Sequence, residues 1–164
     1  IDQWEEAAAS GIPLTRSMLF LPGESVPVPI FAGTSDHVMD LGAGQLTQFS
    51  NPGEIGNFVV AAHRDGFFRS LKDIEVGDEL RAIDRDGEYR YRVDDITIVE
   101  PSNVDVLASD GGATITLVTC YPFYFQGSAP NRFIVRGSLV GEPSEAESPA
   151  GTATVDPFAS AHDR

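Results

Sequence analysis

One cysteine, at the end of a strand-like segment, is the residue of this chain best suited to nucleophilic chemistry. Residues 114–120 read T-I-T-L-V-T-C, hold the only cysteine, and are followed at once by a tyrosine and a proline. A single thiol cannot form an intramolecular disulfide. Alternation along a strand puts Cys120 on the face opposite Ile115 and Leu117, which are the expected core residues. A lone cysteine is more often an inert buried residue, but the T-L-V-T-C segment around this one favours a nucleophile.

A nucleophilic cysteine needs a base or a cation nearby, because a thiol of pKa about 8.5 is mostly protonated at neutral pH. His63 ends the strand-like run 57–63, and the Arg-Asp-Gly that follows it turns the chain. His37 lies in a polar loop and His162 in the C-terminal tail. His63 is therefore the preferred partner, at the rim of the sheet.

An arginine is the third candidate for the chemistry. Arg132 begins another strand-like run, and its guanidinium stays charged and carries several hydrogen-bond donors. Such a group can bind a substrate carbonyl or stabilise an oxyanion. Without the cysteine motif, a strand-end salt bridge would be the preferred explanation. Arg136 lies on the same face by alternation and is the alternative for this role.

The elements that must position these side chains are mostly strands. Strand patterns cover 17–21, 26–31, 57–62, 79–84, 88–99, 114–119 and 132–140. Asp86 and Gly87 predict a tight hairpin, since glycine accepts the positive φ of such turns. Single helical turns are expected at 35–41, 67–71 and 103–107, the last with Ser102 or Asn103 as its N-cap. Many short strands with few helices favour a closed or nearly closed antiparallel barrel, mainly β in class.

Length and composition fit one compact domain at 14–141 of the 164 residues, with a hydrophobic share of 41%. Residues 1–13 are expected to be a leading helix or a linker remnant. Residues 142–164, rich in Pro, Ser, Ala and Glu, are expected to be a disordered tail. The 11 basic against 25 acidic residues give a net charge of −14, which argues against nucleic acid as a partner.

The order of the three candidates resembles the signature of sortases, the cysteine transpeptidases of bacterial cell surfaces. His63 ends a strand, Thr116 to Cys120 read T-L-V-T-C, and Arg132 opens the last strand of the domain. The likeness extends from Met18 to Val140 and is greatest to class D or related proteobacterial sortases. It implies an eight-stranded sortase-type β-barrel with a few short helices.

The resemblance also implies a reaction. Cys120 would cleave an L-P-x-T-G-like sorting signal after its threonine, giving a thioacyl enzyme that passes to an acceptor amine of a wall peptide or another protein. His63 would move the proton, and Arg132 would hold the threonine carbonyl. Residues next to this triad in sequence are the expected substrate groove: Ala61, Ala62, Val118, Thr119, Tyr121 and Phe133. The place of action would be the extracytoplasmic face of the bacterial membrane, reached through an N-terminal anchor outside this sequence.

Two other functions stay open at this point. An L,D-transpeptidase-like wall enzyme would use similar chemistry, but its usual S-H-G-C-type segment is missing around Cys120. A non-catalytic extracytoplasmic β-barrel binding domain would not need the thiol at all. No cofactor or metal is expected, since one cysteine and three histidines do not make a closed zinc site. The acidic residues between Asp73 and Glu79 fit solvated surface charge better than a calcium cage.

Overall fold

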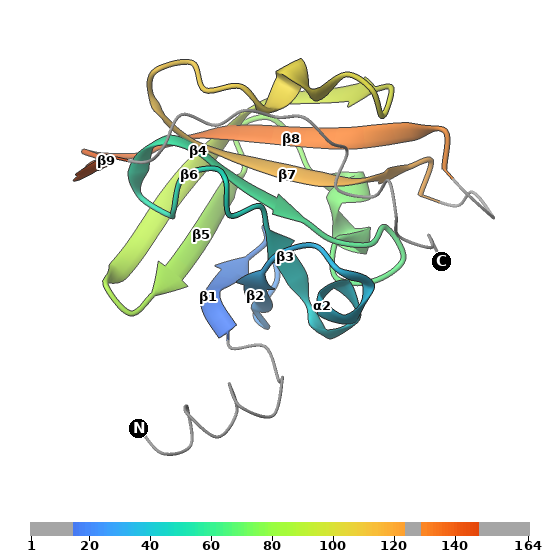
Figure 1. Ribbon diagram of the computed structural model, residues 1–164, viewed down its shortest axis with the longest axis horizontal. Coiled ribbons are helices and arrows are strands. Elements are labelled where there is room, and N and C mark those ends of the chain that lie inside the picture. The colour runs from blue at the N-terminus through green and yellow to red at the C-terminus, as the bar shows by residue number, and fades with distance from the viewer. Residues whose placement is uncertain (1–14, 124–128, 148–164) are drawn as a thin grey trace.

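The fold is a closed β-barrel with short helices on its outside (Figure 1). The structure is a computed structural model that describes residues 15–123 and 129–147. The expected leading helix at 1–13 and the tail beyond residue 147 lie outside the described residues. No described helix is long and apolar enough to cross a membrane.

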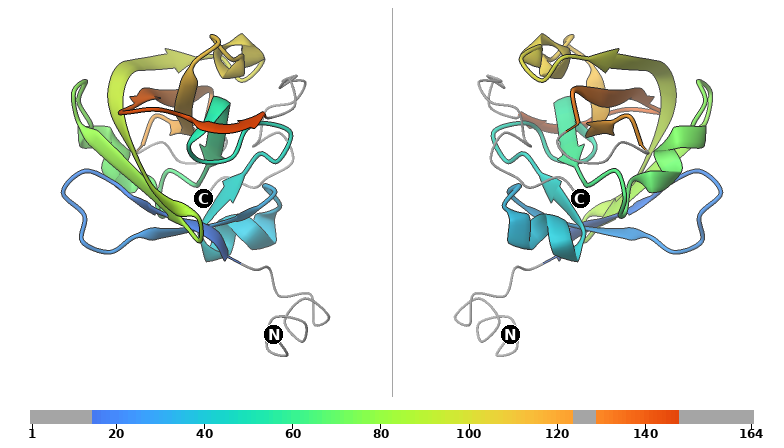
Figure 2. Two further views of the ribbon diagram at one scale, coloured as in Figure 1. Left: turned by 90° about the vertical axis from the view of Figure 1, so that its left-hand side faces the viewer. Right: turned by 90° about the vertical axis from the view of Figure 1, so that its right-hand side faces the viewer.

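Eight strands close the barrel, and a ninth lies at its edge. The strands are β1 (Thr15–Phe20), β2 (Val28–Ala32), β3 (Ala43–Gln45), β4 (Glu54–Ala61), β5 (Glu79–Asp84), β6 (Gly87–Val99), β7 (Ala113–Tyr121), β8 (Asn131–Leu139) and β9 (Ser144–Glu147). Their order is β3-β2-β1-β5-β6-β8-β7-β4-β9, and pairing of β3 with β4 closes the ring. Figure 2 shows the strands wrapping around a common centre. The predicted eight-stranded barrel is confirmed.

The structure differs from the expected strand pattern in three places. The pairs β2–β3 and β4–β7 are parallel, so the barrel is not wholly antiparallel. No strand is predicted for β3, which has three residues. Disorder is predicted after residue 141, whereas β9 lies parallel to the start of β4.

The three expected helical turns are present. They are α2 (Asp36–Leu41) and the 3-10 turns η1 (Arg69–Asp73) and η2 (Val104–Leu107). Ser35 caps α2, because its hydroxyl accepts a hydrogen bond from the Val38 N–H at 3.3 Å. Asn103 precedes η2, but its side chain makes no capping hydrogen bond.

The hairpin between β5 and β6 is confirmed, although the reason given for it is wrong. Asp84 pairs with Gly87, so the two turn residues are Arg85 and Asp86. Gly87 is not among the glycines with positive φ. The Asp84 carboxylate instead accepts hydrogen bonds from the N–H groups of Asp86 at 2.8 Å and Gly87 at 3.1 Å, which stabilise the turn.

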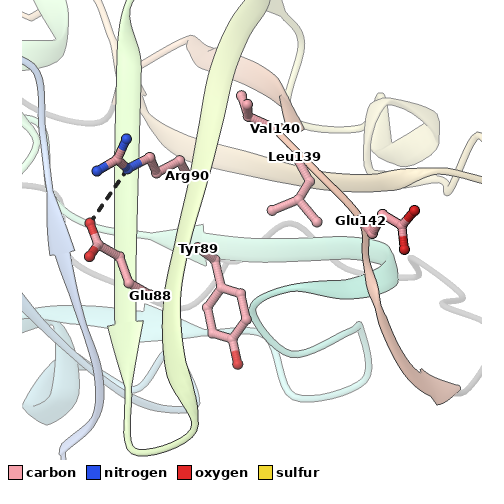
Figure 3. A pocket seen from close by; sticks show the side chains of 6 residues that line it. All are labelled: Glu88, Tyr89, Arg90, Leu139, Val140 and Glu142. Carbon is pink, nitrogen blue, oxygen red and sulfur yellow. Dashed lines mark ion pairs between the residues drawn. The ribbon is translucent and has the colours of Figure 1, made fainter.

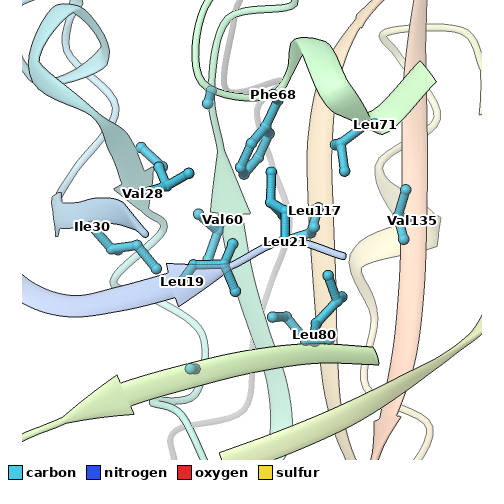
Figure 4. Close-up of a cluster of buried hydrophobic side chains, with 14 of the residues drawn as sticks. Leu19, Leu21, Val28, Ile30, Val60, Phe68, Leu71, Leu80, Leu117 and Val135 are labelled. Carbon is cyan, nitrogen blue, oxygen red and sulfur yellow. The ribbon is translucent and has the colours of Figure 1, made fainter. Parts of the chain in front are cut away.

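The barrel interior is one apolar core built by alternation along the strands. Ile115 and Leu117 of β7 point into it, as the sequence predicts, together with Phe58 and Val60 of β4. Figure 4 shows part of this interior core, which also receives Phe68 from the segment before η1.

A second apolar cluster lies on the opposite, outer face of β4, β7 and β8. We call it the outer cluster, and its buried members are Met39, Leu46, Phe49, Val59, Ala61, Leu107, Val118, Cys120, Ala129 and Ile134. These residues come from the three strands and from α2, η2 and loops that cover them. The face of the sheet that carries Cys120 is therefore itself packed.

A buried tyrosine supplies a prediction for stability and its pH dependence. The hydroxyl of Tyr91 accepts a hydrogen bond from the Gly53 N–H at 2.8 Å. Tyr91→Phe leaves that buried N–H without its partner, and we expect a loss of about 1–3 kcal/mol in the free energy of unfolding. Urea denaturation measures it, and an unchanged midpoint would contradict the expectation.

Burial also raises the pKa of Tyr91 above its ordinary value. An unfolded tyrosine loses its proton near pH ~10, so above that pH the unfolded state binds fewer protons and stability falls. Below that pH this contribution is constant. In Tyr91→Phe the corresponding part of the alkaline decline should be missing.

Candidate active site

The ends of three neighbouring strands bring the predicted triad to one edge of the barrel. β7 lies between β4 and β8 (Figure 1). Cys120 of β7 is the cross-strand partner of Arg132 in β8. On the other side, Ala61 of β4 is the partner of Val118, so His63 and Cys120 each follow a paired residue by two positions. Residues far apart in the sequence thus meet where these strands end.

The strand register also puts Cys120 and Arg132 on the outer face. Val118 and Ile134 are partners and both belong to the outer cluster. Cys120 follows Val118 and Arg132 precedes Ile134 by two residues, so alternation turns them to the same side. The predicted orientation of Cys120, away from Ile115 and Leu117, agrees with the membership of the two clusters.

All three candidate side chains are covered. Cys120 is 1% exposed, His63 4% and Arg132 8%. The thiol lies among apolar residues, as an inert cysteine also would. His63 and Arg132 follow the same strand ends, and an imidazole and a guanidinium are the kinds of base and cation that a reactive thiol needs.

Arg132 is oriented by its own loop. Its Nη1 donates hydrogen bonds to the carbonyls of Ala129 at 3.3 Å and Asn131 at 3.0 Å. A guanidinium has five N–H donors in a rigid fork, so bonds at one nitrogen fix the direction of the others. The side chain is therefore held beside the end of β7.

Arg136, the alternative to Arg132, has a different task. It is paired with Thr116, which lies four residues before Cys120 on the same face of β7. Its nitrogens donate to the carbonyls of Val106 at 3.1 Å and Ala108 at 2.9 Å. These bonds hold η2 against the barrel. Arg136 is thus engaged away from the edge where Cys120 lies.

A buried side-chain amide of β4 holds η2 in place, and it is not among the residues predicted from the sequence. Asn57 donates to the Leu107 carbonyl at 2.9 Å and accepts hydrogen bonds from the hydroxyls of Thr114 at 3.0 Å and Thr116 at 2.7 Å. Leu107 in turn belongs to the outer cluster with Cys120. The polar network therefore supports one of the elements that cover the thiol.

The expected groove residues separate onto two faces. Ala61 and Val118 lie in the outer cluster beside Cys120. Ala62 and Phe133 belong to the interior core, and Tyr121 packs against it. Thr119 is fully buried and, by alternation, shares their side of the sheet.

Three aromatic rings pack together on the interior side of the sheet, next to the end of β7 and the start of β8. Tyr121 stacks on Phe133 with centroids 5.9 Å apart, and Phe123 contacts both rings edge-on, at 6.0 Å and 5.1 Å. Because these rings lie on the core side, we assign Tyr121 and Phe133 a supporting position rather than a place beside the thiol.

The remaining histidines do not point to a second site in the described part of the chain. His37 is exposed on α2, not in a loop as expected, and His162 lies outside the described residues. Among the described residues, no group of three His, Cys, Asp or Glu side chains is arranged to hold a metal ion.

A surface hollow lies beside the start of β6 (Figure 3). Its lining is Glu88, Tyr89, Arg90, Leu139, Val140 and Glu142. Arg81 donates a hydrogen bond to Glu88 at 2.9 Å, which lowers the pKa of that carboxyl, and Arg90 lies 3.7 Å from it. This hollow contains an ion pair, and none of the candidate residues Cys120, His63 and Arg132 lines it.

Comparison with known proteins agrees with the likeness noted from the sequence. The family model described as "Sortase domain" matches residues 19–140. Sortase D of Bacillus subtilis (strain 168) is 33% identical over 137 residues, covering 83% of this chain and 66% of that protein. The chain thus spans slightly less than two thirds of this curated relative.

Solved structures share the fold. A Clostridium perfringens Sortase D5 transpeptidase matches with a TM-score of 0.69 and 26% identity, over 85% of this chain and 89% of that one. A pilus-related Sortase C of Group B Streptococcus matches with a TM-score of 0.71 and 30% identity, over 77% and 68%. The names of the first relatives fit the predicted likeness to class D, while its proteobacterial part stays a prediction.

Proposed function

The chain belongs to the sortase family, whose members are cysteine transpeptidases, and from this we propose that Cys120, His63 and Arg132 form its active site. The observation that carries the proposal is the strand register, in which Cys120 faces Arg132 and the β4–β7 pairing leads directly into His63. The proposed substrate is a surface or secreted protein with an L-P-x-T-G-like sorting signal. The proposed acceptor is an amine of a wall peptide or of another protein.

The first half-reaction would make a thioester. The thiolate of Cys120, paired with a protonated His63, attacks the carbonyl carbon of the threonine, so that a C–S bond forms while the C–N bond to the next residue breaks. His63 gives its proton to the departing amine. Arg132 donates hydrogen bonds to the carbonyl oxygen as negative charge develops on it.

The second half-reaction would reverse the proton transfer. The acceptor amine attacks the thioester carbonyl and gives a proton to His63, a new C–N bond forms, and the thiolate of Cys120 leaves. Ala61 and Val118, which share the face of Cys120, are the proposed floor of the substrate groove. The other predicted groove residues lie on the interior face of the sheet and support the groove without lining it: Ala62, Thr119, Tyr121 and Phe133.

We place this activity on the extracytoplasmic side of a bacterial membrane, where members of the family act. The proposal favours the transpeptidase over an L,D-transpeptidase-like enzyme, since the sortase family model matches residues 19–140, which contain β2 to β8 and the end of β1. It also favours catalysis over a binding domain, because a buried thiol flanked by His63 and Arg132 serves no evident binding purpose.

Mass spectrometry of the intact protein tests the function. After incubation with an L-P-x-T-G peptide, the expected result is a mass increase equal to the acyl fragment ending in threonine, located on Cys120 by digestion. Addition of an excess amine should remove the adduct and yield the ligated peptide. Absence of an adduct with a library of sorting peptides would refute the proposal and favour a binding domain.

The proposed role of Arg132 gives a paired prediction. Arg132→Lys should lower kcat/KM for peptide cleavage by about 10²-fold, because an ammonium cannot reproduce the rigid fork of donors at the carbonyl oxygen. Arg136→Lys is the matched control: it loses bonds to η2 and should lower Tm, with less than about a tenfold change in kcat/KM. A larger kinetic loss in Arg136→Lys than in Arg132→Lys would reverse the assignment.

A further inference from the structure

Arg64, the residue after His63, is a buried cation that the proposed reaction does not use. It is 1% exposed and is among the largest fully buried side chains of the described chain. A buried charged group lowers stability relative to an apolar side chain of similar size unless its hydrogen bonds compensate for lost water. Its presence therefore points to a role other than simple core packing.

The guanidinium joins the two segments that leave the active-site strands. Its Nη1 donates a hydrogen bond to the Pro122 carbonyl at 3.0 Å. Arg64 directly follows His63, and Pro122 follows Cys120 by two residues. One side chain thus connects the chain just past the imidazole to the chain just past the thiol.

The sheet itself does not fix this part of the site. The β4–β7 register ends at Ala61 and Val118, and one further bond runs from the Ala62 N–H to the Val118 carbonyl at 3.2 Å. After that His63 enters a turn, closed by the Gly66 N–H on the His63 carbonyl at 3.3 Å. The spacing between imidazole and thiol therefore depends on contacts beyond the ladder, and the Arg64–Pro122 bond spans that gap.

Residues that belong to the interior core or pack against it flank both ends of this bond. Ala62 and Phe68, on either side of Arg64 in the sequence, are fully buried in the interior core. Tyr121 and Phe123, on either side of Pro122, pack against the same core and against each other. A hydrogen bond between two segments anchored in this way restricts their positions relative to each other.

We infer that Arg64 is a positioning residue that sets the separation of His63 and Cys120; this inference rests on the proposed function of those two residues. In the proposed role, Arg64 acts through His63 and Cys120 and not by contact with the reacting atoms. Its effect is on the alignment of imidazole and thiol, where a displacement of about 1 Å can cost about 10²-fold in rate.

The test compares Arg64→Met, which keeps length and removes the donors, with Arg64→Lys, which keeps one charged donor group. Arg81→Met is the matched control, since Arg81 bonds to Glu88 and stacks on Phe20 far from the strand ends. In single-turnover experiments Arg64→Met should form the thioacyl adduct about 10- to 100-fold more slowly with KM changed less than about twofold. Arg64→Lys should recover part of the rate, and Arg81→Met should match the unmodified protein.

A second measurement does not need a sorting peptide. The ring resonances of His63 are titrated by NMR in the presence and absence of Cys120→Ala, and the change in titration midpoint measures how strongly the two groups interact. In the Arg64→Met background this change should shrink by at least about half, as expected for a coupling that depends on distance. Where Arg64→Met does not fold, Arg64→Lys takes its place in both measurements.

The outcomes separate the inference from the proposed function. An unmodified protein that gives no thioacyl adduct refutes the transpeptidase, while loss of His63–Cys120 coupling on Arg64→Met still supports the positioning role. A folded Arg64→Met with unchanged coupling and unchanged acylation overturns the inference. So does an unmodified protein without coupling, because Arg64 then has nothing to position.

Discussion

Cys120→Ala is expected to abolish the thioacyl adduct and to lower peptide cleavage by at least about 10³-fold, because no other described side chain at this edge is a comparable nucleophile. The fold should survive. Removing one sulfur from the outer cluster leaves a small cavity, worth about 1 kcal/mol in the free energy of unfolding. Intact-protein mass spectrometry and a cleavage assay measure the first effect, and urea denaturation the second.

Val59→Ala is the control for this variant. Val59 is fully buried in the same outer cluster, so its truncation also makes a cavity there, yet the thiol stays. We expect a loss of stability of about 1–2 kcal/mol with the adduct still formed. A loss of cleavage much smaller than about 10³-fold in Cys120→Ala, or equal kinetic losses in the two variants, would show that the thiol matters for packing rather than for chemistry.

Asn57→Leu is expected to cause the largest loss of stability, about 3–5 kcal/mol. The change removes the side-chain partner of the Leu107 carbonyl and of the Thr116 hydroxyl, and it leaves the Thr114 hydroxyl with only a long hydrogen bond of 3.5 Å to the Gly56 carbonyl. Each such group costs about 1–3 kcal/mol when left unsatisfied, and whole domains are stable by only about 5–15 kcal/mol. Because η2 then loses its anchor, peptide cleavage should fall as well. Urea denaturation gives the stability.

A rescue and a control make this prediction specific. Adding Thr114→Val and Thr116→Val to Asn57→Leu removes both hydroxyls, and stability should partly return. Asn103→Leu changes the same residue type on the exposed approach to η2, where the side chain makes no capping bond, and should be nearly neutral. If the triple variant is no more stable than Asn57→Leu, the network explanation is wrong.

Much of the barrel could be predicted from the sequence because alternation is a strong signal in strands that are buried on one face. Glu79–Asp84 and its partner strand show it, and their hairpin was located correctly. Its glycine was misjudged because an aspartate can satisfy the turn by hydrogen bonds to the backbone. β3 has only three residues, all buried, so no period is visible in it. The parallel pairs depend on tertiary contacts that no local pattern contains.

The candidate site was predictable to a similar degree. Cys120, His63 and Arg132 were chosen because each stands at the end of a strand-like run; the strand register brings those ends together, and their catalytic roles stay a prediction. Arg64 and Asn57 were missed as functional residues because a polar residue gives no local sign that it will be buried. Tyr121 and Phe133 were assigned to the groove by nearness in sequence, which ignores the face of the sheet.

The parallel pairing of β4 with β7 has a consequence for the order of events during synthesis and folding. Asn57 is aligned with Thr114, and Cys120 with Arg132, so the site needs strands from the first half of the chain and from its last third. Long-range pairings of this kind form slowly, since the conformational entropy of a long stretch of chain is lost before the pairing contacts contribute stability. A nascent chain still lacking β8 therefore cannot have this site assembled, and the thiol stays without its partners until nearly the whole barrel has emerged.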